Sequence, residues 1–267
     1  MLLRRITQHV KNENWFAVTL DFIIVVIGVA VAMMGQQWLS ERDQRQNTIQ
    51  AEIVLQDDLR RNYFNAKERV AVSKCRIEAY QSILQKLLEP GEEWIGMRRS
   101  TEGADVVSYN TALPNILRSP SRTWGSNNWH AELARGTFNS MEVDRRNRID
   151  GLFRQAEHAQ KLQREIYTLQ GRMKTLAFTM RIDQQDRLRY LDTLGEMDLK
   201  SGLTELIAGQ IATNIENTGI DLSPEVIMQG NEFVTAYNKS AQNIYGDCYV
   251  PFNFNAITES NQQETQP

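Results

Sequence analysis

Cysteine and histidine are scarce in this chain of 267 residues, which has only two cysteines and three histidines. No H-E-x-x-H pattern and no cysteine-rich spacing occurs, so the usual zinc ligand sets are missing. The chain also lacks a G-x-S-x-G elbow, a phosphate-binding P-loop and the glycine pattern of a dinucleotide-binding fold. We therefore predict that the protein is not an enzyme and holds no cofactor or metal.

Clustered positive charge is missing as well. The chain has 30 Lys and Arg against 33 Asp and Glu, a formal net charge of -3. A nucleic-acid surface needs a local excess of basic residues, so we expect no nucleic-acid partner. The sequence has no low-complexity tract and no convincing internal repeat. Its length is that of one to two domains, and most of it has the composition of an ordinary soluble protein.

One long apolar run stands out against this background. Residues 22–34 are apolar without a break, and Trp15 and Trp38 flank the run. About 20 helical residues are needed to cross roughly 30 Å of hydrocarbon, and Trp favours the headgroup level. The run is too long for a strand and lacks the polar face of a soluble core helix. It predicts a transmembrane helix over residues 15–38.

The basic residues near its two ends set the expected orientation. Arg4, Arg5 and Lys11 precede the run, whereas the basic residues that follow it are interleaved with acidic ones. The positive-inside rule then makes residues 1–14 a cytoplasmic basic leader and residues 39–250 an extracytoplasmic domain. A cleaved signal peptide is the alternative, because residues 30–32 fit an A-x-A site. The long leader, and an apolar run that continues past that site, favour a retained anchor.

Asp21 lies inside the predicted span. An ionisable residue there is by default a candidate for a proton path or for contact with a partner helix. It also follows Trp15 by six residues, about 9 Å along a helix axis. Its carboxylate would then lie near the inner edge of the hydrocarbon, within reach of water and headgroups. We favour this second interpretation.

The N-terminal segment combines several short motifs. It has a basic leader, an Asn-Trp step, a Leu-Asp-Phe entry and a Val/Ile/Gly-rich span that ends near a Trp, which here are Arg4-Arg5, Asn14-Trp15, Leu20-Asp21-Phe22, Ile23–Val31 and Trp38. In this combination the segment resembles a family of uncharacterised proteobacterial single-span inner-membrane proteins. Residues 124–153 resemble a second block of the family, in which a Trp-containing helix and a small residue plus Gly precede a new helix.

The exit of the span departs from the family pattern. Residues 33–38 read MMGQQW, where the family usually has a sequence closer to QVANW, which leaves the end of the span less sharply defined. The resemblance implies a bacterial inner-membrane protein with a periplasmic domain. It implies no activity.

The rest of the chain predicts an all-α domain built on two long antiparallel helices with shorter helices alongside. Residues 40–88 contain no Gly or Pro, and Glu89-Pro90-Gly91 ends the segment. A second long helix is expected over 141–180, continuing with a kink towards residue 194. Shorter helices are expected over 94–100, 106–117, 203–215 and 224–245, and another is expected to start at a cap, either Ser121 or Ser126, and to end at Arg135-Gly136. Residues 251–267 are expected to form a disordered tail. The first long helix carries a heptad stripe at residues 59, 63, 66, 70, 73, 77, 80, 84 and 87, as in a coiled coil, and a second stripe at 72, 75, 79 and 83.

The two cysteines could form one disulfide bond. In a periplasm, Cys75 and Cys248 would tend to pair and tie the C-terminal segment to the first long helix. Two buried reduced thiols are the alternative.

Four residues around one short helix form the only cluster with the character of a site. Trp124, Trp129, His130 and Phe138 gather within fifteen residues. They either line a ligand pocket, because pockets are lined by aromatic and a few polar groups, or they wedge the short helix into the core. Two functional hypotheses follow. The first is a membrane-anchored interaction or scaffold module that binds other membrane or periplasmic proteins or itself, besides the lipid bilayer. The second is a sensor-like periplasmic domain that binds a small ligand at these aromatic residues.

Overall fold

The computed structural model describes residues 15–97, 120–139, 141–217 and 224–254. Within these ranges most residues are helical. The α-helices are α2 (Trp15–Ala71), α3 (Ser73–Leu88), α4 (Asn127–Ala134), α5 (Val143–Met173), α6 (Gln184–Asn217) and α7 (Pro224–Tyr245). Two short 3-10 helices, η2 (Lys174–Ala177) and η3 (Gly246–Cys248), and two short strands, β1 (Glu93–Trp94) and β2 (Met180–Arg181), complete the described elements.

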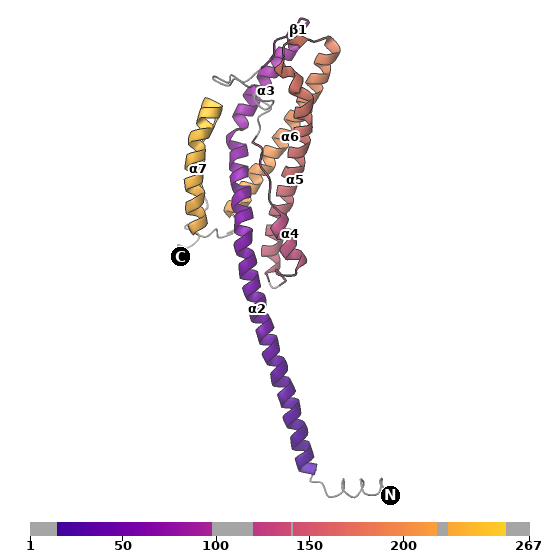
Figure 1. Cartoon of the computed structure of the whole chain (residues 1–267), viewed down its shortest axis with the longest axis vertical. Helices are drawn as coiled ribbons and strands as arrows, with labels where there is room; N and C mark the ends of the chain where they lie inside the picture. Colours follow the sequence, from indigo (N-terminus) through magenta and orange to yellow (C-terminus); the bar gives the residue numbers. More distant parts are fainter. Residues whose placement is uncertain (1–14, 98–119, 140, 218–223, 255–267) are drawn as a thin grey trace, which may run out of the picture.

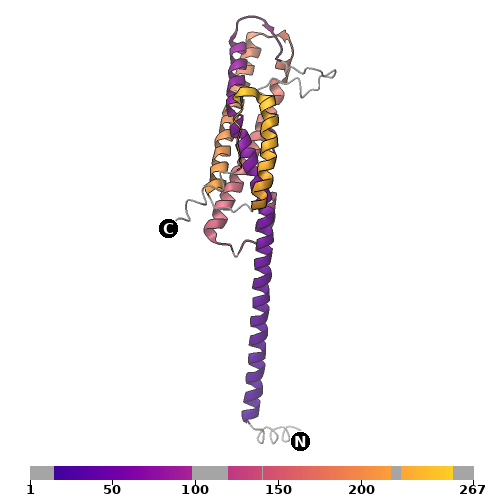
Figure 2. The ribbon, with the colours of Figure 1, turned by 90° about the vertical axis from the view of Figure 1, so that its left-hand side faces the viewer.

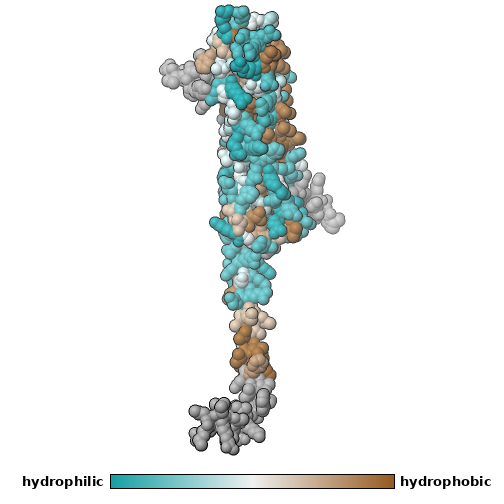
Figure 3. All heavy atoms as spheres, turned by 90° about the vertical axis from the view of Figure 1, so that its right-hand side faces the viewer, coloured by the Kyte–Doolittle hydropathy of each residue, from teal (hydrophilic) through white to brown (hydrophobic). Residues whose placement is uncertain are grey.

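Helix α2 is one continuous helix that extends far beyond the other elements (Figure 1). Its N-terminal part includes an apolar window long enough to cross a membrane, and none of that window is buried by the rest of the chain. Figure 3 shows it as an apolar band separated from the domain by a polar stretch. The first core residues of α2 are Ala51 and Leu55. The helix therefore joins the apolar segment to the domain with no described break between them.

The two long helices of the domain run in the same direction, so the predicted antiparallel pair is wrong. Arg145 near the start of α5 pairs with Glu52 in the lower part of the domain, whereas Met173 at the end of α5 packs with Leu87 at the end of α3. Helix α6 is antiparallel to both. Its early Lys200 bonds Glu165 late in α5, and its late Glu216 bonds Tyr63 of α2.

The physical reason for this error is the connection between the long helices. Antiparallel neighbours are expected where the loop between two helices is short. Here residues 89–142 separate them, and residues 120–126 run back down the bundle as extended chain (Figure 1). Helix α5 consequently starts beside the lower part of α2 and rises parallel to it.

The first long helix is divided at Val72, which separates α2 from α3. Below the break the first heptad stripe faces the core, with Leu59, Tyr63 and Ala66 buried. At the break the stripe leaves the core, and Val70 and Ile77 are exposed. Val72 of the second stripe is buried at the break, and beyond it one member of each stripe, Ile83 and Leu87, is fully buried. The first stripe therefore faces the core at both ends of this segment but not around the break.

At the end of the bundle away from the apolar segment, two short strands form a pair that the sequence pattern did not predict. Strands β1 and β2 pair antiparallel, with Trp94 opposite Met180. The indole Nε1 of Trp94 donates to the carbonyl oxygen of Leu176 over 2.8 Å. A Cβ at Gly96 would lie 2.5 Å from the carbonyl oxygen of Ala177, so only glycine allows the two backbones to meet. The helix expected over 94–100 is absent from its described part, and the one expected over 106–117 lies outside the described residues.

Several predicted helix ends are confirmed. Leu88 ends α3, Pro224 starts α7, and Gly136 and Gly246 follow α4 and α7 with φ of +72° and +74°. Two other boundaries were wrong. Helix α5 ends in η2 and β2 without continuing towards residue 194, and the segment 203–215 is part of the longer α6. Apolar residues continue at helical spacing across both boundaries, so periodicity alone did not indicate where these helices begin and end.

Candidate functional site

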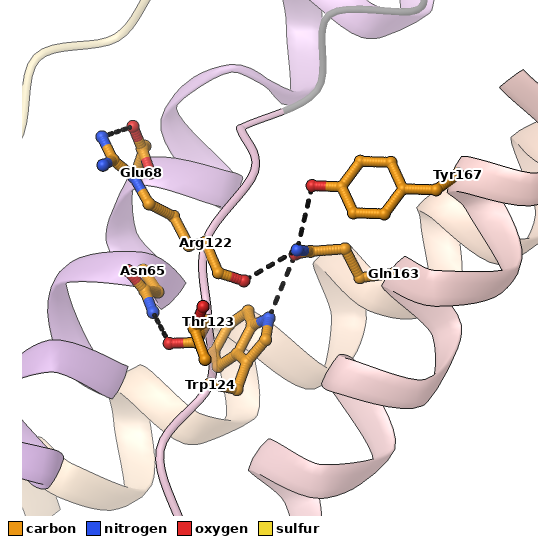
Figure 4. Close-up of polar contacts among 7 residues, drawn as sticks. All are labelled: Asn65, Glu68, Arg122, Thr123, Trp124, Gln163 and Tyr167. Atoms are coloured by element: carbon orange, nitrogen blue, oxygen red, sulfur yellow. Dashed lines mark hydrogen bonds and ion pairs between the residues drawn. The ribbon is translucent and has the colours of Figure 1, made fainter.

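The strap, as we call residues 120–126, is the extended segment that passes between α2 and α5. Figure 4 shows it with side chains from both helices turned towards it. An extended segment inside a helical bundle cannot pair its own backbone groups, and unpaired buried groups are costly. The sequence places amides beside it. Asn62 both donates to the Gly125 carbonyl oxygen over 2.7 Å and accepts from the Gly125 N–H over 2.8 Å.

Further amides complete this pattern. Asn65 donates to the carbonyl oxygen of Thr123 over 3.1 Å, and Gln163 donates to the carbonyl oxygen of Arg122 over 2.7 Å (Figure 4). The Trp124 N–H donates to Gln160. Side-chain amides thus replace the backbone partners that a β-ladder would supply. The strap is fixed in register between α2 and α5, and it belongs to the framework of the domain.

Arg122 of the strap forms a bidentate ion pair with Glu68 of α2. Its Nε and Nη2 donate to the two carboxylate oxygens over 2.7 and 2.9 Å. Only 2 % of Glu68 is exposed. Hydrogen bonding to this carboxylate raises the pKa of the Arg122 guanidinium above its usual value, so the cation is permanent. The Cζ atom of Arg122 also lies over the rings of Phe64 and Tyr237, 5.4 and 5.8 Å from their centroids.

The aromatic residues singled out in the sequence lie in the core. Trp129, which is 0 % exposed, stacks on Phe138 and on Phe153, with ring centroids 5.0 and 5.6 Å apart. Its Nε1 donates to Asp150 over 3.0 Å. Trp124 is buried and donates to Gln163. These contacts favour the interpretation that the rings wedge α4 against α2 and α5.

His130 is separated from this stack. It is exposed on α4 and pairs with Glu157 of α5 on the surface. The structure therefore does not bring the four predicted residues around one cavity. In the described part of the chain no group of three His, Cys, Asp or Glu side chains comes close enough to hold a metal ion. Asp21 lies in α2, and its side chain lies outside the described set.

Cys75 and Cys248 are joined by a disulfide. The bond ties η3, at the end of α7, to α3, and the chain then turns back along α2. The N–H of Val250 donates to the Ala71 carbonyl oxygen, and Asn238 of α7 donates to the carbonyl oxygen of Phe252. Phe254 is buried beside Tyr63, with ring centroids 4.8 Å apart. Residues 251–254 are thus packed, which corrects the predicted tail for its described part.

Three tyrosines around this C-terminal segment have raised pKa values. Burial is the largest cause for each, and acidic neighbours add to it: Glu216 beside Tyr63, and Glu68 beside Tyr237 and Tyr249. Burial and these neighbours raise the pKa of Tyr249 to about 12. All three hydroxyls therefore remain neutral in the folded chain at a pH where an exposed tyrosine ionises, near 10.

We expect the free energy of unfolding to fall as the pH rises above about 10. The unfolded chain releases these protons near that pH and the folded chain only at higher pH, so the unfolded state binds fewer protons between the two values. The stabilisation is complete below about pH 10 and is lost as the pH rises towards 12. Urea unfolding at pH 8 to 11, with tyrosinate absorbance followed in parallel, measures this. In a Tyr237→Phe variant the free energy of unfolding should fall less steeply with pH. An unchanged pH dependence would contradict the raised pKa of this tyrosine.

The outer side of α6 carries a regular pattern of exposed leucines and glycines. Leu199 is 64 % exposed and Leu206 is 59 % exposed. Three glycines, Gly195, Gly202 and Gly209, alternate with them at steps of four and three residues. We call these five residues the α6 face. Figure 3 shows apolar colour along the edge of the domain where α6 lies.

The glycines of the α6 face are not needed for packing inside the chain. A Cβ added to any of them would meet no atom within 4 Å. Each glycine within a helix costs about 0.5–1 kcal/mol relative to alanine. A surface with leucine ridges and glycine gaps at heptad spacing allows another helix to approach closely. Periodicity did not single out this stripe, because α6 has apolar residues on its inner side as well.

The comparisons with known proteins add no relative. No protein-family model matches the chain, and neither a curated protein nor a solved structure matches it significantly.

Proposed function

We propose that this chain is a membrane-anchored interaction module of the bacterial inner membrane, with its helical domain in the periplasm. The apolar part of α2 is the anchor, and the α6 face is the surface that docks a helix of a protein partner. The exposed leucines of the α6 face carry the proposal, because they alternate at helical spacing with glycines that leave room for a second helix. The basic leader supports the orientation.

The continuity of α2 supports an anchored role for the domain. From residue 39 to residue 50 the helix has only partial cover, at Thr48, whose hydroxyl donates to the Thr137 carbonyl oxygen. These twelve helical residues span about 18 Å. They separate most of the bundle from the predicted membrane surface, and among the described residues only the segment at Thr137 reaches down to this part of α2. A partner anchored in the same membrane would meet this face at a fixed height.

Photo-cross-linking of the full chain in its native membrane tests this function. We expect a photoreactive residue at Leu206 to give a discrete adduct, whose mass distinguishes a second copy of the chain from another protein. The same residue at Arg164, which is exposed on α5, is the matched control and should give none. Replacing Leu199 and Leu206 by Asp should abolish partner recovery while the helical circular dichroism remains, since surface substitutions rarely change stability by more than about 0.5 kcal/mol.

Equal adducts at Leu206 and at Arg164 would argue against a specific docking surface. Partner recovery that survives the two Asp substitutions would move the interaction to another part of the chain.

A further inference from the structure

A surface pocket with a volume of about 470 Å³ opens at the edge of the core, because two of its lining residues, Phe64 and Phe254, belong to the main hydrophobic cluster. Four segments that are distant in the sequence form it. Helix α2 contributes Arg61 and Phe64, the strap contributes Arg122, α7 contributes Phe233, and the C-terminal segment contributes Phe254. We call it the arginine pocket. None of the residues that the sequence singled out as a site belongs to it.

Positive charge dominates the polar side of the arginine pocket. Arg60, Arg61 and Arg122 line it, and none of the described residues that line it is acidic. Arg122 is held by Glu68, and Arg60 lies 3.0 Å from the carboxylate of Asp57. Arg61 is exposed and forms no ion pair with any of the residues described. One guanidinium at the pocket is thus left uncompensated, with its hydrogen-bond donors available to an anion.

The pocket also has an aromatic wall, and the Arg122 guanidinium lies over one of its rings, that of Phe64. Phe64 contacts Phe233 edge to face, with ring centroids 5.0 Å apart, and Phe254 closes the same wall. Phe233 is 56 % exposed, so much of the apolar surface of its ring is in contact with water. The polar residues Asn65, Ser121 and Thr123 line the pocket as well. An apolar wall with a few convergent polar groups is the usual composition of a small-molecule site.

We propose that the arginine pocket binds a soluble organic anion, in which a carboxylate or phosphate group is attached to an aromatic or aliphatic body. The anionic group pairs with Arg61, and the body packs on Phe64 and Phe233. A lipid headgroup of the anchoring bilayer is out of reach. Arg61 follows Trp38 by 23 residues of continuous helix, which places it about 35 Å further along the axis. This site is separate from the α6 face, and its test does not depend on the partner.

The experiment uses the full chain in lipid nanodiscs and titrates it calorimetrically with 1-naphthaleneacetate, with empty nanodiscs as the reference. The neutral 1-naphthaleneethanol is the probe for the aromatic wall alone. We expect Arg61→Gln to weaken binding of the anion by about tenfold or more, the loss typical of one charge-assisted hydrogen bond. It should leave binding of the alcohol unchanged. Arg148→Gln, which removes an exposed arginine of α5, is the matched control and should leave both unchanged.

A second variant tests the wall. Phe233→Ala should weaken binding of both compounds, because both place the same naphthalene ring on it. The proposal is overturned if the alcohol binds as tightly as the anion, if Arg61→Gln and Arg148→Gln have equal effects, or if neither compound gives heat above the empty nanodiscs. Competition by 1-naphthyl phosphate then decides which anionic group the pocket prefers.

Discussion

Replacing both Cys75 and Cys248 by alanine is expected to lower the free energy of unfolding by up to about 5 kcal/mol in the chain-entropy model. The disulfide joins residues 173 positions apart, and closing so long a loop removes much freedom from the unfolded chain. Urea unfolding of the full chain in detergent micelles, followed by circular dichroism, measures the change. Reduction of the native disulfide with dithiothreitol should have the same effect on the native chain and none on the variant.

Without the disulfide, loss of structure should begin in the C-terminal part of the domain. Helix α7 packs against α2 on the outside of the bundle (Figure 2). It is held there by the disulfide, by the aromatic contacts of Phe64 and by the residues that follow η3. In the double variant we expect hydrogen exchange to accelerate first in residues 224–254, before α5 and α6. Uniform acceleration across all helices would contradict a local role for the bond.

Trp129→Ala is expected to destabilise the domain by about 3–5 kcal/mol, the range for removing a large buried aromatic side chain. Trp129 is completely buried between Phe138 and Phe153. Its removal leaves a cavity beside α4 and takes one hydrogen-bond donor from Asp150, which keeps its ion pair with Arg154. The midpoint of urea unfolding should fall accordingly, with little change in slope.

Two further variants separate the contributions at this position. Trp129→Phe keeps an aromatic ring in the stack but loses the hydrogen bond to Asp150, so it should cost clearly less than alanine. His130→Ala changes the exposed neighbour on the same helix and should cost about 0.5 kcal/mol or less. If Trp129→Ala proved as mild as His130→Ala, the core assignment of this cluster would be wrong.

The sequence predicted the features that depend on neighbouring residues. The length of the apolar run, the start of α7 at Pro224 and its end before Gly246 depend on helix rise, on the fixed φ of proline and on the freedom of glycine at positive φ. The same is true of the helical content and of the end of α3. These are properties of a few consecutive residues, and they hold whatever the rest of the chain does.

Tertiary structure decided the direction of the helices and the place of the surfaces. The amphipathic pattern of residues 141–180 is the same for a helix parallel or antiparallel to α2, and only the return of the strap along α2 determines which occurs. The arginine pocket likewise draws on α2, the strap, α7 and Phe254, so no local spacing could indicate it. The leucines of α6 illustrate the same limit. A helix with apolar residues on two sides shows which residues avoid water, but which side remains exposed depends on the neighbours that pack against it.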